Sequence, residues 1–157
     1  MKARIRAKQY VIDRRLLMEL VQNHVEHFYR GCGYNCAETI FCAACTAWGL
    51  EFTEDTLKLM AGFGGGMGTA NVCGAVTGSV AALSYRYTQE GGGHKSPYLM
   101  EKVRLFMRTV KKELEDETCR TMKPRFYCKE TKCLPTIMVV AKILDEVDQM
   151  EVIIPEK

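Results

Sequence analysis

Residues 62–78 read GFGGGMGTANVCGAVTG, a glycine-rich loop that runs into a helix-like segment. Glycine adopts positive φ angles and allows another backbone to approach closely, so this cluster indicates an unusual path of the chain. We predict that Asn71 caps the following helix and that Cys73 lies in its first turn. Gly74 and Gly78 then share one face of the helix, which a second backbone or a bound group can approach.

The predicted position of Cys73 favours the thiolate form of its side chain. The first N–H groups of a helix have no partner within it, and the helix dipole is positive at that end. Both effects lower the pKa of a cysteine thiol. A buried, inert cysteine in a tight helix-packing turn is the plainer interpretation, and it stays open because free cysteine is commonly buried.

Length and composition indicate an ordinary globular protein. The chain has 157 residues, of which 47% are hydrophobic and 26% charged, and this is enough for one core that needs neither disulfides nor metal. We treat residues 1–157 as a single helical domain. It comprises a basic N-terminal arm and first helix (1–30), a cysteine-bearing helical core (31–149) and a C-terminal tail (150–157).

Charge and hydropathy limit the expected partners and location. Six basic residues and one acidic residue give the first 15 positions a charge of +5, against +3 for the whole chain. Such a terminus is more often a solvated helix start than a nucleic-acid-binding arm, so we expect no nucleic-acid partner. No apolar run reaches the roughly 20 residues that span a bilayer, and no secretory signal follows the basic start. We therefore expect a cytoplasmic protein without membrane insertion.

Eight cysteines are unusual in a chain that is expected inside the cell. They are Cys32, Cys36, Cys42, Cys45, Cys73, Cys119, Cys128 and Cys133. Cytosolic thiols are kept reduced, so this number points to metal or redox chemistry rather than to a disulfide framework.

The apolar periodicity predicts an all-α, single-domain bundle of about five or six helices with a glycine-rich loop. No segment shows the sustained alternation of a β-strand. The expected helices span residues 8–29, 36–48, 54–60, the run from Cys73 to residue 87, 97–117 and 135–149. Residues 118–122 form either one more turn or a short helix of their own, which Pro124 closes.

Two further cysteines are predicted at helix starts. Asn35 and Glu38 have the spacing of a capping box, which puts Cys36 at the first helical position. Cys133 comes just before Pro135, a residue that favours the first turn of a helix. With Cys73, three thiols are thus expected at or near helix N-termini, where their pKa values are lowered.

Other candidate ligands have plainer interpretations. Cys42 and Cys45 match C-x-x-C, but they lie inside an alanine-rich helix with no strand before it, and we assign them to core packing. His24 and His27 are one helical turn apart and have no third ligand nearby in the sequence. We expect both to be partly exposed helix residues.

Five parts of the sequence together resemble the C-GCAxxG-C-C family of putative redox-active proteins. They are GYNCAE (33–38), GGGMG (64–68), CGAVTG (73–78), Cys119 and Cys133. The similarity spans roughly residues 28–147. The resemblance implies a redox function but supplies no mechanism.

The family's shared cysteines correspond here to Cys36, Cys73, Cys119 and Cys133. We expect these four to converge in the fold and to act as catalytic thiols or as metal ligands. Cys32 and Cys128 are close enough in sequence to serve as supplementary thiols. The candidate cofactor-binding residues are Gly64, Gly65, Gly66, Gly68, Gly74 and Gly78.

Two chemistries use four thiols of this kind. Four thiolates suit tetrahedral zinc or an iron–sulfur cluster, although gaps of 37, 46 and 14 residues lack the compact C-x-x-C knuckle. Dithiol–disulfide exchange needs only a pair, in which a low-pKa thiol attacks and its neighbour resolves. A c-type haem is not expected because the sequence has no C-x-x-C-H.

We predict a redox-active protein, a candidate oxidoreductase, that uses clustered cysteines for thiol–disulfide or electron-transfer chemistry with an unidentified redox partner. A bound metal or iron–sulfur cluster is one form of this prediction. The alternatives are a structural metal-binding or protein-interaction module without turnover, and a small-molecule binder that uses the glycine loop. That loop lacks the Lys-Ser/Thr ending of a P-loop. Homo-oligomerisation stays open.

Overall fold

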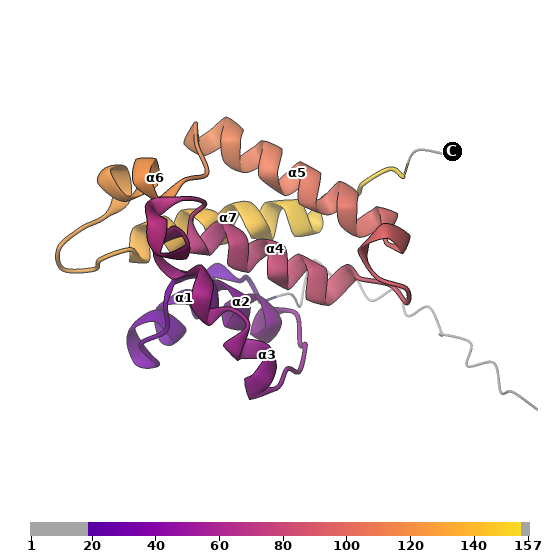
Figure 1. Ribbon diagram of the computed structural model, residues 1–157, viewed down its shortest axis with the longest axis horizontal. Helices are drawn as coiled ribbons and strands as arrows, with labels where there is room; N and C mark the ends of the chain where they lie inside the picture. The colour runs from indigo at the N-terminus through magenta and orange to yellow at the C-terminus, as the bar shows by residue number, and fades with distance from the viewer. Residues whose placement is uncertain (1–18, 155–157) are drawn as a thin grey trace, which may run out of the picture.

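The computed structural model describes residues 19–154, in which seven α-helices occur and no strand (Figure 1). The helices are α1 (Gln22–Glu26), α2 (Cys36–Ala47), α3 (Glu54–Lys58), α4 (Gly74–Tyr87), α5 (Pro97–Leu114), α6 (Cys119–Phe126) and α7 (Leu134–Gln149). A π-helical turn lies at His27–Gly31, and 3-10 turns lie at Ala61–Phe63 and Gly93–Lys95. The segment Gly66–Ala70 is a kinked turn with positive φ angles at Gly66, Met67, Gly68 and Ala70. The all-α prediction is confirmed, and the count is seven rather than five or six.

The three long helices α4, α5 and α7 lie along one another, and α2 packs on the side of α4 away from α5 (Figure 1). Helix α1 contacts α2 and α7, and α3 contacts α2. Their facing sides form one core, whose fully buried members include Phe41, Leu83, Phe106, Ile137 and Leu144. None of the helices within residues 19–154 has the length and apolar character needed to cross a bilayer.

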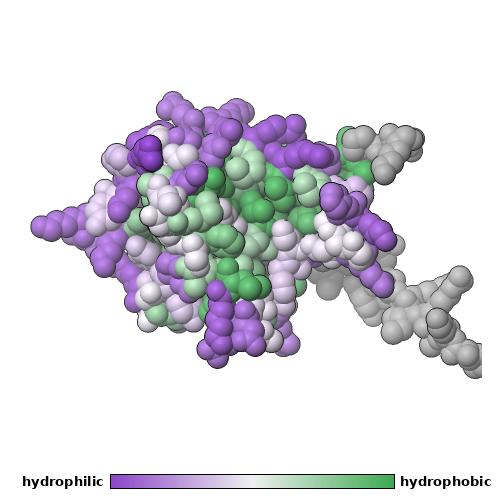
Figure 2. Space-filling view, in the orientation of Figure 1, coloured by the Kyte–Doolittle hydropathy of each residue, from purple (hydrophilic) through white to green (hydrophobic). Residues whose placement is uncertain are grey.

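One face of the molecule carries an apolar area surrounded by hydrophilic side chains (Figure 2). This area lies over α4 and the adjoining side of α5. It includes an open groove of about 400 Å³ lined by Phe63, Val72, Val76, Thr77, Val80, Ala81 and Met107.

The predicted helix over residues 8–29 is not continuous within the described part, because residues 19–21 are not helical and α1 begins at Gln22. The Asp145 carboxylate of α7 accepts hydrogen bonds from the N–H groups of Val21 (2.7 Å) and Gln22 (3.3 Å), and α1 starts at that point. A side chain 124 positions away thus provides the cap, which local sequence signals cannot reveal. The rest of the predicted helix (8–18), like the basic arm, lies outside the described residues.

Helix α6 is the additional helix, the second of the two options predicted for that segment. Glu115 takes a left-handed conformation (φ 65°) and ends α5 at Leu114, a few residues before the predicted end at about Glu117. Thr118 then caps α6 by accepting a hydrogen bond from the Thr121 N–H (3.4 Å). Pro124 lies inside α6 and does not close it, because its missing N–H removes a single hydrogen bond from a helix that ends two residues later.

Helices α2 and α4 cross closely at two glycines. A Cβ atom at position 78 would lie 2.5 Å from the Ala37 carbonyl oxygen and 2.4 Å from Cγ2 of Ile40. A Cβ atom at position 74 would lie 3.1 Å from Cβ of Cys36. Glycine at these positions lets the two backbones approach, as predicted, and it brings the N-terminal ends of both helices together.

The far end of α7 is anchored by a buried lysine. Lys102 of α5 is 1% exposed, and its ammonium group donates hydrogen bonds to the carbonyl oxygens of Val147 (2.8 Å), Asp148 (3.0 Å) and Met150. These carbonyls end the helix and carry the negative end of its dipole, which a cation stabilises. The lysine therefore fixes α7 at the end opposite to Cys133.

Replacing Gly78 by alanine should destabilise the fold. The added methyl group overlaps the Ala37 backbone and forces α2 and α4 apart, and overpacking of this kind costs about 1–3 kcal/mol. The free energy of unfolding, measured with a chemical denaturant, should fall by that amount.

Gly62→Ala is the matched control, because a Cβ atom at position 62 would meet nothing within 4 Å. Its free energy of unfolding should stay within about 0.5 kcal/mol of the unaltered protein. Equal losses in the two variants would show that the crossing does not require glycine.

Candidate functional site

The four cysteines named by the sequence prediction surround one cavity of about 70 Å³. Its lining consists of Cys36, Gly65, Cys73, Gly74, Cys119, Met122, Lys123, Cys133 and Thr136. Each cysteine starts a different helix: two are the first residues of α2 and α6, and two are the N-cap residues of α4 and α7. Four helix N-termini, each with unpaired N–H groups and the positive end of a dipole, therefore meet at the thiols.

Cys36 is placed by the predicted capping box. The Asn35 side-chain oxygen accepts hydrogen bonds from the N–H groups of Ala37 (2.9 Å) and Glu38 (3.1 Å). In return, the Glu38 carboxylate accepts one from the Asn35 N–H (2.9 Å). This reciprocal pair fixes the start of α2. The predicted position of Cys36, the first residue of the helix, is confirmed.

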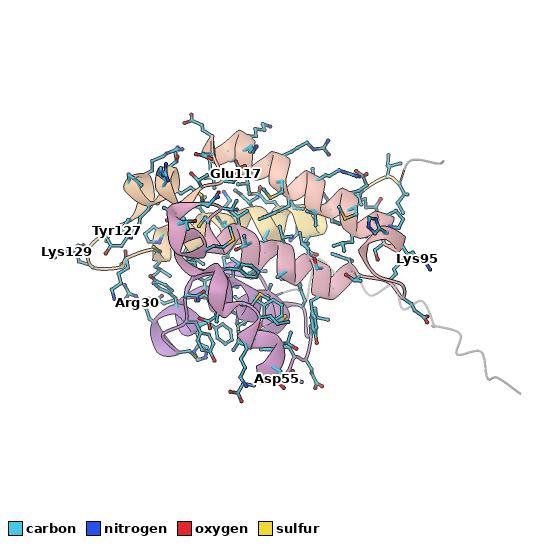
Figure 3. All side chains as sticks on the ribbon, viewed as in Figure 1. Arg30, Asp55, Lys95, Glu117, Tyr127 and Lys129 are labelled. Atoms are coloured by element: carbon cyan, nitrogen blue, oxygen red, sulfur yellow. The ribbon has the colours of Figure 1, made fainter. Side chains whose placement is uncertain are left out.

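Cys73 and Cys119 are joined through their backbones. The Cys73 N–H donates to the Glu117 carbonyl (2.8 Å), and the Cys119 N–H donates to the Asn71 carbonyl (2.7 Å). Figure 3 shows Glu117 between the start of α4 and the end of α5. These two bonds form an antiparallel bridge, in which alternate residues point to the same face. Both cysteines therefore lie on one side of the bridge.

The same bridge corrects the predicted cap of α4. It holds Asn71 outside the helical region (φ −80°, ψ −146°), so the helix begins only at Gly74 and Cys73 itself is the N-cap residue. The Asn71 side-chain oxygen accepts a hydrogen bond from the adjacent Val72 N–H (2.9 Å) and reaches no N–H group inside the helix. The prediction that Asn71 caps α4 is wrong.

Cys133 is held by Tyr29, a residue that the sequence analysis did not identify. The Cys133 N–H donates a hydrogen bond to the Tyr29 hydroxyl oxygen (3.1 Å). Before it, Cys128 and Lys132 pair through two backbone hydrogen bonds in a tight turn. The contact between residues 104 positions apart connects the start of α7 to the turn that follows α1.

Cys36 and Cys133 form a hydrogen-bonded pair of sulfurs with opposite pKa shifts. The hydrogen bond from the Cys36 thiol lowers the pKa of Cys133 to about 6, against the opposing effect of burial. The Lys123 ammonium group and the Tyr29 hydroxyl lower it further. The same hydrogen bond, followed by burial, raises the pKa of Cys36 far above the ordinary range. Of the two sulfurs, Cys133 is therefore the one that ionises more readily, and Cys36 keeps its proton.

Burial decides the state of the other two thiols in the cavity. It raises the pKa of Cys73, which is 3% exposed, to about 11, although the N–H groups of Ala75 and Val76 act in the opposite direction. Burial, followed by the charge on Cys133, also raises the pKa of Cys119. Lowered pKa values were predicted for three cysteines, and the prediction is wrong for two of them. At Cys36 the Cys133 sulfur, followed by burial, raises the pKa, and at Cys73 desolvation outweighs the helix N-terminus.

The remaining cysteines lie elsewhere. Cys42 and Cys45 are buried in the core, and burial raises the pKa of each to about 12, in agreement with the packing role that we predicted. Cys32 is exposed and Cys128 half-buried, and neither lines the cavity. The Cys128 thiol interacts with Glu130 (3.1 Å) in its own turn.

The glycines of the predicted cofactor site take different positions. Gly65 and Gly74 line the cavity, and Gly65 also lines a wider adjoining cleft together with Gly68. Gly64 packs against the Asn35 side chain, and Gly66 has a positive φ angle beside the Asn71 backbone. Gly78 faces α2. Cofactor binding by these six residues stays a prediction.

Thiol sulfurs are suitable donors for a metal, but these thiols are not arranged around a common point. Four cysteine sulfurs are a common donor set for zinc and iron–sulfur clusters. Among the residues that the structure describes, however, no three His, Cys, Asp or Glu side chains are arranged around a point that could hold a metal ion. A metal at this position stays a prediction. The reactivity of the thiols themselves can be measured directly.

Sequence patterns missed three residues around the thiols: Tyr29, Lys123 and Thr136. The last two line the cavity from α6 and from the first turn of α7. Spacing was an available signal for two of them, because Thr136 lies three positions after Cys133 and Lys123 four positions after Cys119, and residues so spaced in a helix share a face. Tyr29 comes from a distant segment and had none.

Comparison with known proteins places the same cysteines in a family pattern. A family model described as "Putative redox-active protein (C_GCAxxG_C_C)" matches residues 34–147, which contain all four cysteines of the cavity. An uncharacterized protein of Archaeoglobus fulgidus is 39% identical over 62 residues, which cover 39% of this chain and 40% of that relative. The match thus spans less than half of either protein. No solved structure matches the chain.

Cys133 should react with iodoacetamide as a thiolate at mildly acidic pH. Because its pKa is lowered to about 6, its alkylation rate should rise between about pH 5 and 7 and then level off, whereas an ordinary thiol accelerates to about pH 9. Mass spectrometry of the peptide that carries Cys133 measures the rate at each pH.

Two variants define the cause of this reactivity. Cys36→Ala removes the hydrogen-bond donor and should move the midpoint of the Cys133 profile to higher pH. Cys32→Ala removes a thiol outside the cavity and should leave the profile unchanged. A midpoint near pH 8.5, the ordinary value, in the unaltered protein would contradict the thiolate assignment.

Proposed function

The chain belongs to the C-GCAxxG-C-C family of putative redox-active proteins, and we propose that it exchanges electrons with a partner by reversible formation of a disulfide between Cys36 and Cys133. The observation that carries this proposal is the shared cavity, which both thiols line, and each sulfur shifts the pKa of the other in the opposite direction. Dithiol–disulfide exchange needs an attacking thiolate and a second thiol within reach, and the pair supplies one of each.

Cys133 is the attacking group. Its sulfur attacks one sulfur of the partner's disulfide, the partner's S–S bond breaks, and the second partner sulfur leaves as a thiolate that takes up a proton. The product is a mixed disulfide between Cys133 and the partner. Cys36, Lys123 and Tyr29 stabilise the thiolate before attack.

Cys36 resolves the mixed disulfide. Its pKa is raised chiefly by the Cys133 sulfur, and this cause weakens once that sulfur carries no negative charge. Cys36 then loses its proton and attacks Cys133, and the remaining partner sulfur leaves as a thiol. The two cysteines have given up two electrons and the proton of Cys36, a second proton has come from solvent, and the partner disulfide has become a dithiol. The reverse sequence oxidises a partner dithiol.

The partner has access to the thiols from one side. A cleft of about 600 Å³ adjoins the cavity and shares Gly65, Cys119 and Lys123 with it. The cleft is also lined by Arg120 and Tyr127, so its charged side chains are basic. A partner segment of neutral or acidic character therefore fits this entrance.

The reduced protein should form a Cys36–Cys133 disulfide in a mild thiol–disulfide redox buffer. Because both sulfurs lie in the cavity and one is a thiolate, the disulfide should appear before any other. After the free thiols are blocked with N-ethylmaleimide, peptide mass spectrometry identifies the linked pair.

Cys36→Ala and Cys133→Ala should each abolish this disulfide, and Cys128→Ala, outside the cavity, should not. A first disulfide between other cysteines would overturn the assignment. Metal and acid-labile sulfide are measured on the same anaerobically purified protein. Stoichiometric zinc with unreactive thiols would support the structural alternative, and iron with labile sulfide would support a cluster.

A further inference from the structure

The hydroxyl group of Thr136 is buried at the cavity without a partner. Thr136 is 3% exposed, lines the cavity, and its Oγ1 atom has no hydrogen bond within the described part of the chain. An unpaired buried hydroxyl costs about 1–3 kcal/mol. A polar molecule in the cavity would satisfy it, at a point one helical turn from Cys133.

The volume of the cavity limits that molecule to a few atoms. About 70 Å³ can hold a few water molecules, since each needs roughly 10–15 Å³ of such space. Pockets for larger organic ligands measure about 300–1,000 Å³. A peptide or a nucleotide is therefore too large to enter the cavity and must approach the half-buried Cys133 from outside it, whereas a molecule with two oxygen atoms fits inside, beside the thiols.

The cavity presents three kinds of group to such a molecule: a nucleophilic sulfur, a resolving thiol and a hydroxyl donor. We propose that it binds hydrogen peroxide or another small hydroperoxide, which Cys133 reduces while Thr136 hydrogen-bonds the departing oxygen. This inference rests on the Cys36–Cys133 cycle proposed above and names the oxidant of that cycle. The partner dithiol then supplies the electrons.

The first step oxidises one sulfur. The Cys133 sulfur attacks one peroxide oxygen, the O–O bond breaks, and a new S–O bond makes the sulfenic acid. The other oxygen leaves as hydroxide, which takes up a proton from solvent and becomes water. The Thr136 hydroxyl donates to this oxygen as its negative charge develops, and the nearby Lys123 ammonium group favours the same charge.

The second step restores a stable product. The Cys36 sulfur attacks the sulfur of the sulfenic acid, an S–S bond forms, and the hydroxyl leaves as water with the proton of Cys36. Two thiols and one peroxide thus give one disulfide and two water molecules. A partner dithiol reduces the disulfide by exchange, and it is oxidised in turn.

Thr136→Val tests the hydroxyl directly, because valine keeps the shape of the side chain and lacks the donor. The reduced protein is mixed with hydrogen peroxide, and formation of the Cys36–Cys133 disulfide is followed by rapid quenching with N-ethylmaleimide. The second-order rate should fall on the order of 100-fold, the effect of removing one donor to a developing oxyanion. Thr136→Ser keeps the hydroxyl and should restore most of the rate.

A neutral aromatic disulfide, 4,4′-dithiodipyridine, serves as a second oxidant that needs no oxyanion donor. Its rate should be the same in the unaltered protein and in the Thr136 variants. Thr109→Val is the matched control on α5, because Thr109 donates to the Leu105 carbonyl (2.9 Å) and does not line the cavity. In Cys36→Ala, dimedone should trap the sulfenic acid on Cys133.

Each result has a separate meaning. Equal peroxide rates in Thr136→Val and the unaltered protein would overturn the role of Thr136 and leave it a hydroxyl bound to water. A peroxide rate no higher than that of free cysteine, with the disulfide still formed by dithiodipyridine, would overturn the hydroperoxide inference alone. If neither oxidant links Cys36 to Cys133, the proposed cycle itself fails.

The lining of the adjoining cleft is consistent with entry of the reductant from that side. Tyr127 lies on the loop that follows α6, at the end of the molecule (Figure 3). Peroxide needs no such surface, because it diffuses through openings the size of water. The two substrates of the cycle therefore use spaces of different size that meet at Cys119 and Lys123.

Discussion

The close crossing of α4 over the start of α2 is the constraint on which the cysteine cavity depends. The space that a side chain at Gly78 would fill is taken by the Ala37 backbone, and the space beside Gly74 by Cys36. Cys73 immediately precedes the crossing, so the two helix starts arrive together. The glycines of the CGAVTG segment thereby position the thiols but take no part in their reactions. The bridge to Cys119 and the Tyr29 contact complete the cavity.

Within the cavity, two electrostatic effects oppose each other at every thiol. The helix N-termini favour the thiolate, and removal from water favours the thiol. Burial prevails at Cys73 and Cys119, whereas direct hydrogen bonds make Cys133 the exception. Only one of two adjacent sulfurs can hold the negative charge, so the pair divides into a nucleophile and a proton-bearing neighbour. The division follows from position and needs no histidine or carboxylate in the lining.

Sequence patterns predicted those parts of this site that depend on residues close together in the chain. The Asn35–Glu38 capping box is local, and it placed Cys36 correctly. Asn71 is a residue type that often caps helices, but a backbone bridge to a segment more than 40 positions away holds it before the start of the helix. The start of α1 depends on Asp145 in the same way. Tyr29 became part of the site only through folding, since no spacing rule connects it to the start of α7.

The separation of the reacting pair along the chain couples the state of the thiols to the stability of the whole fold. Cys36 lies at the start of the second helix and Cys133 at the start of the last, 97 positions later. A bond between them would tie the unfolded chain into a ring, which in the chain-entropy view is worth roughly 5 kcal/mol for a loop near 100 residues. By thermodynamic linkage, the native fold must favour the bond by the same amount. Oxidant would then act on this protein as a stabilising ligand, and its resistance to heat and proteolysis would report the redox poise of its surroundings.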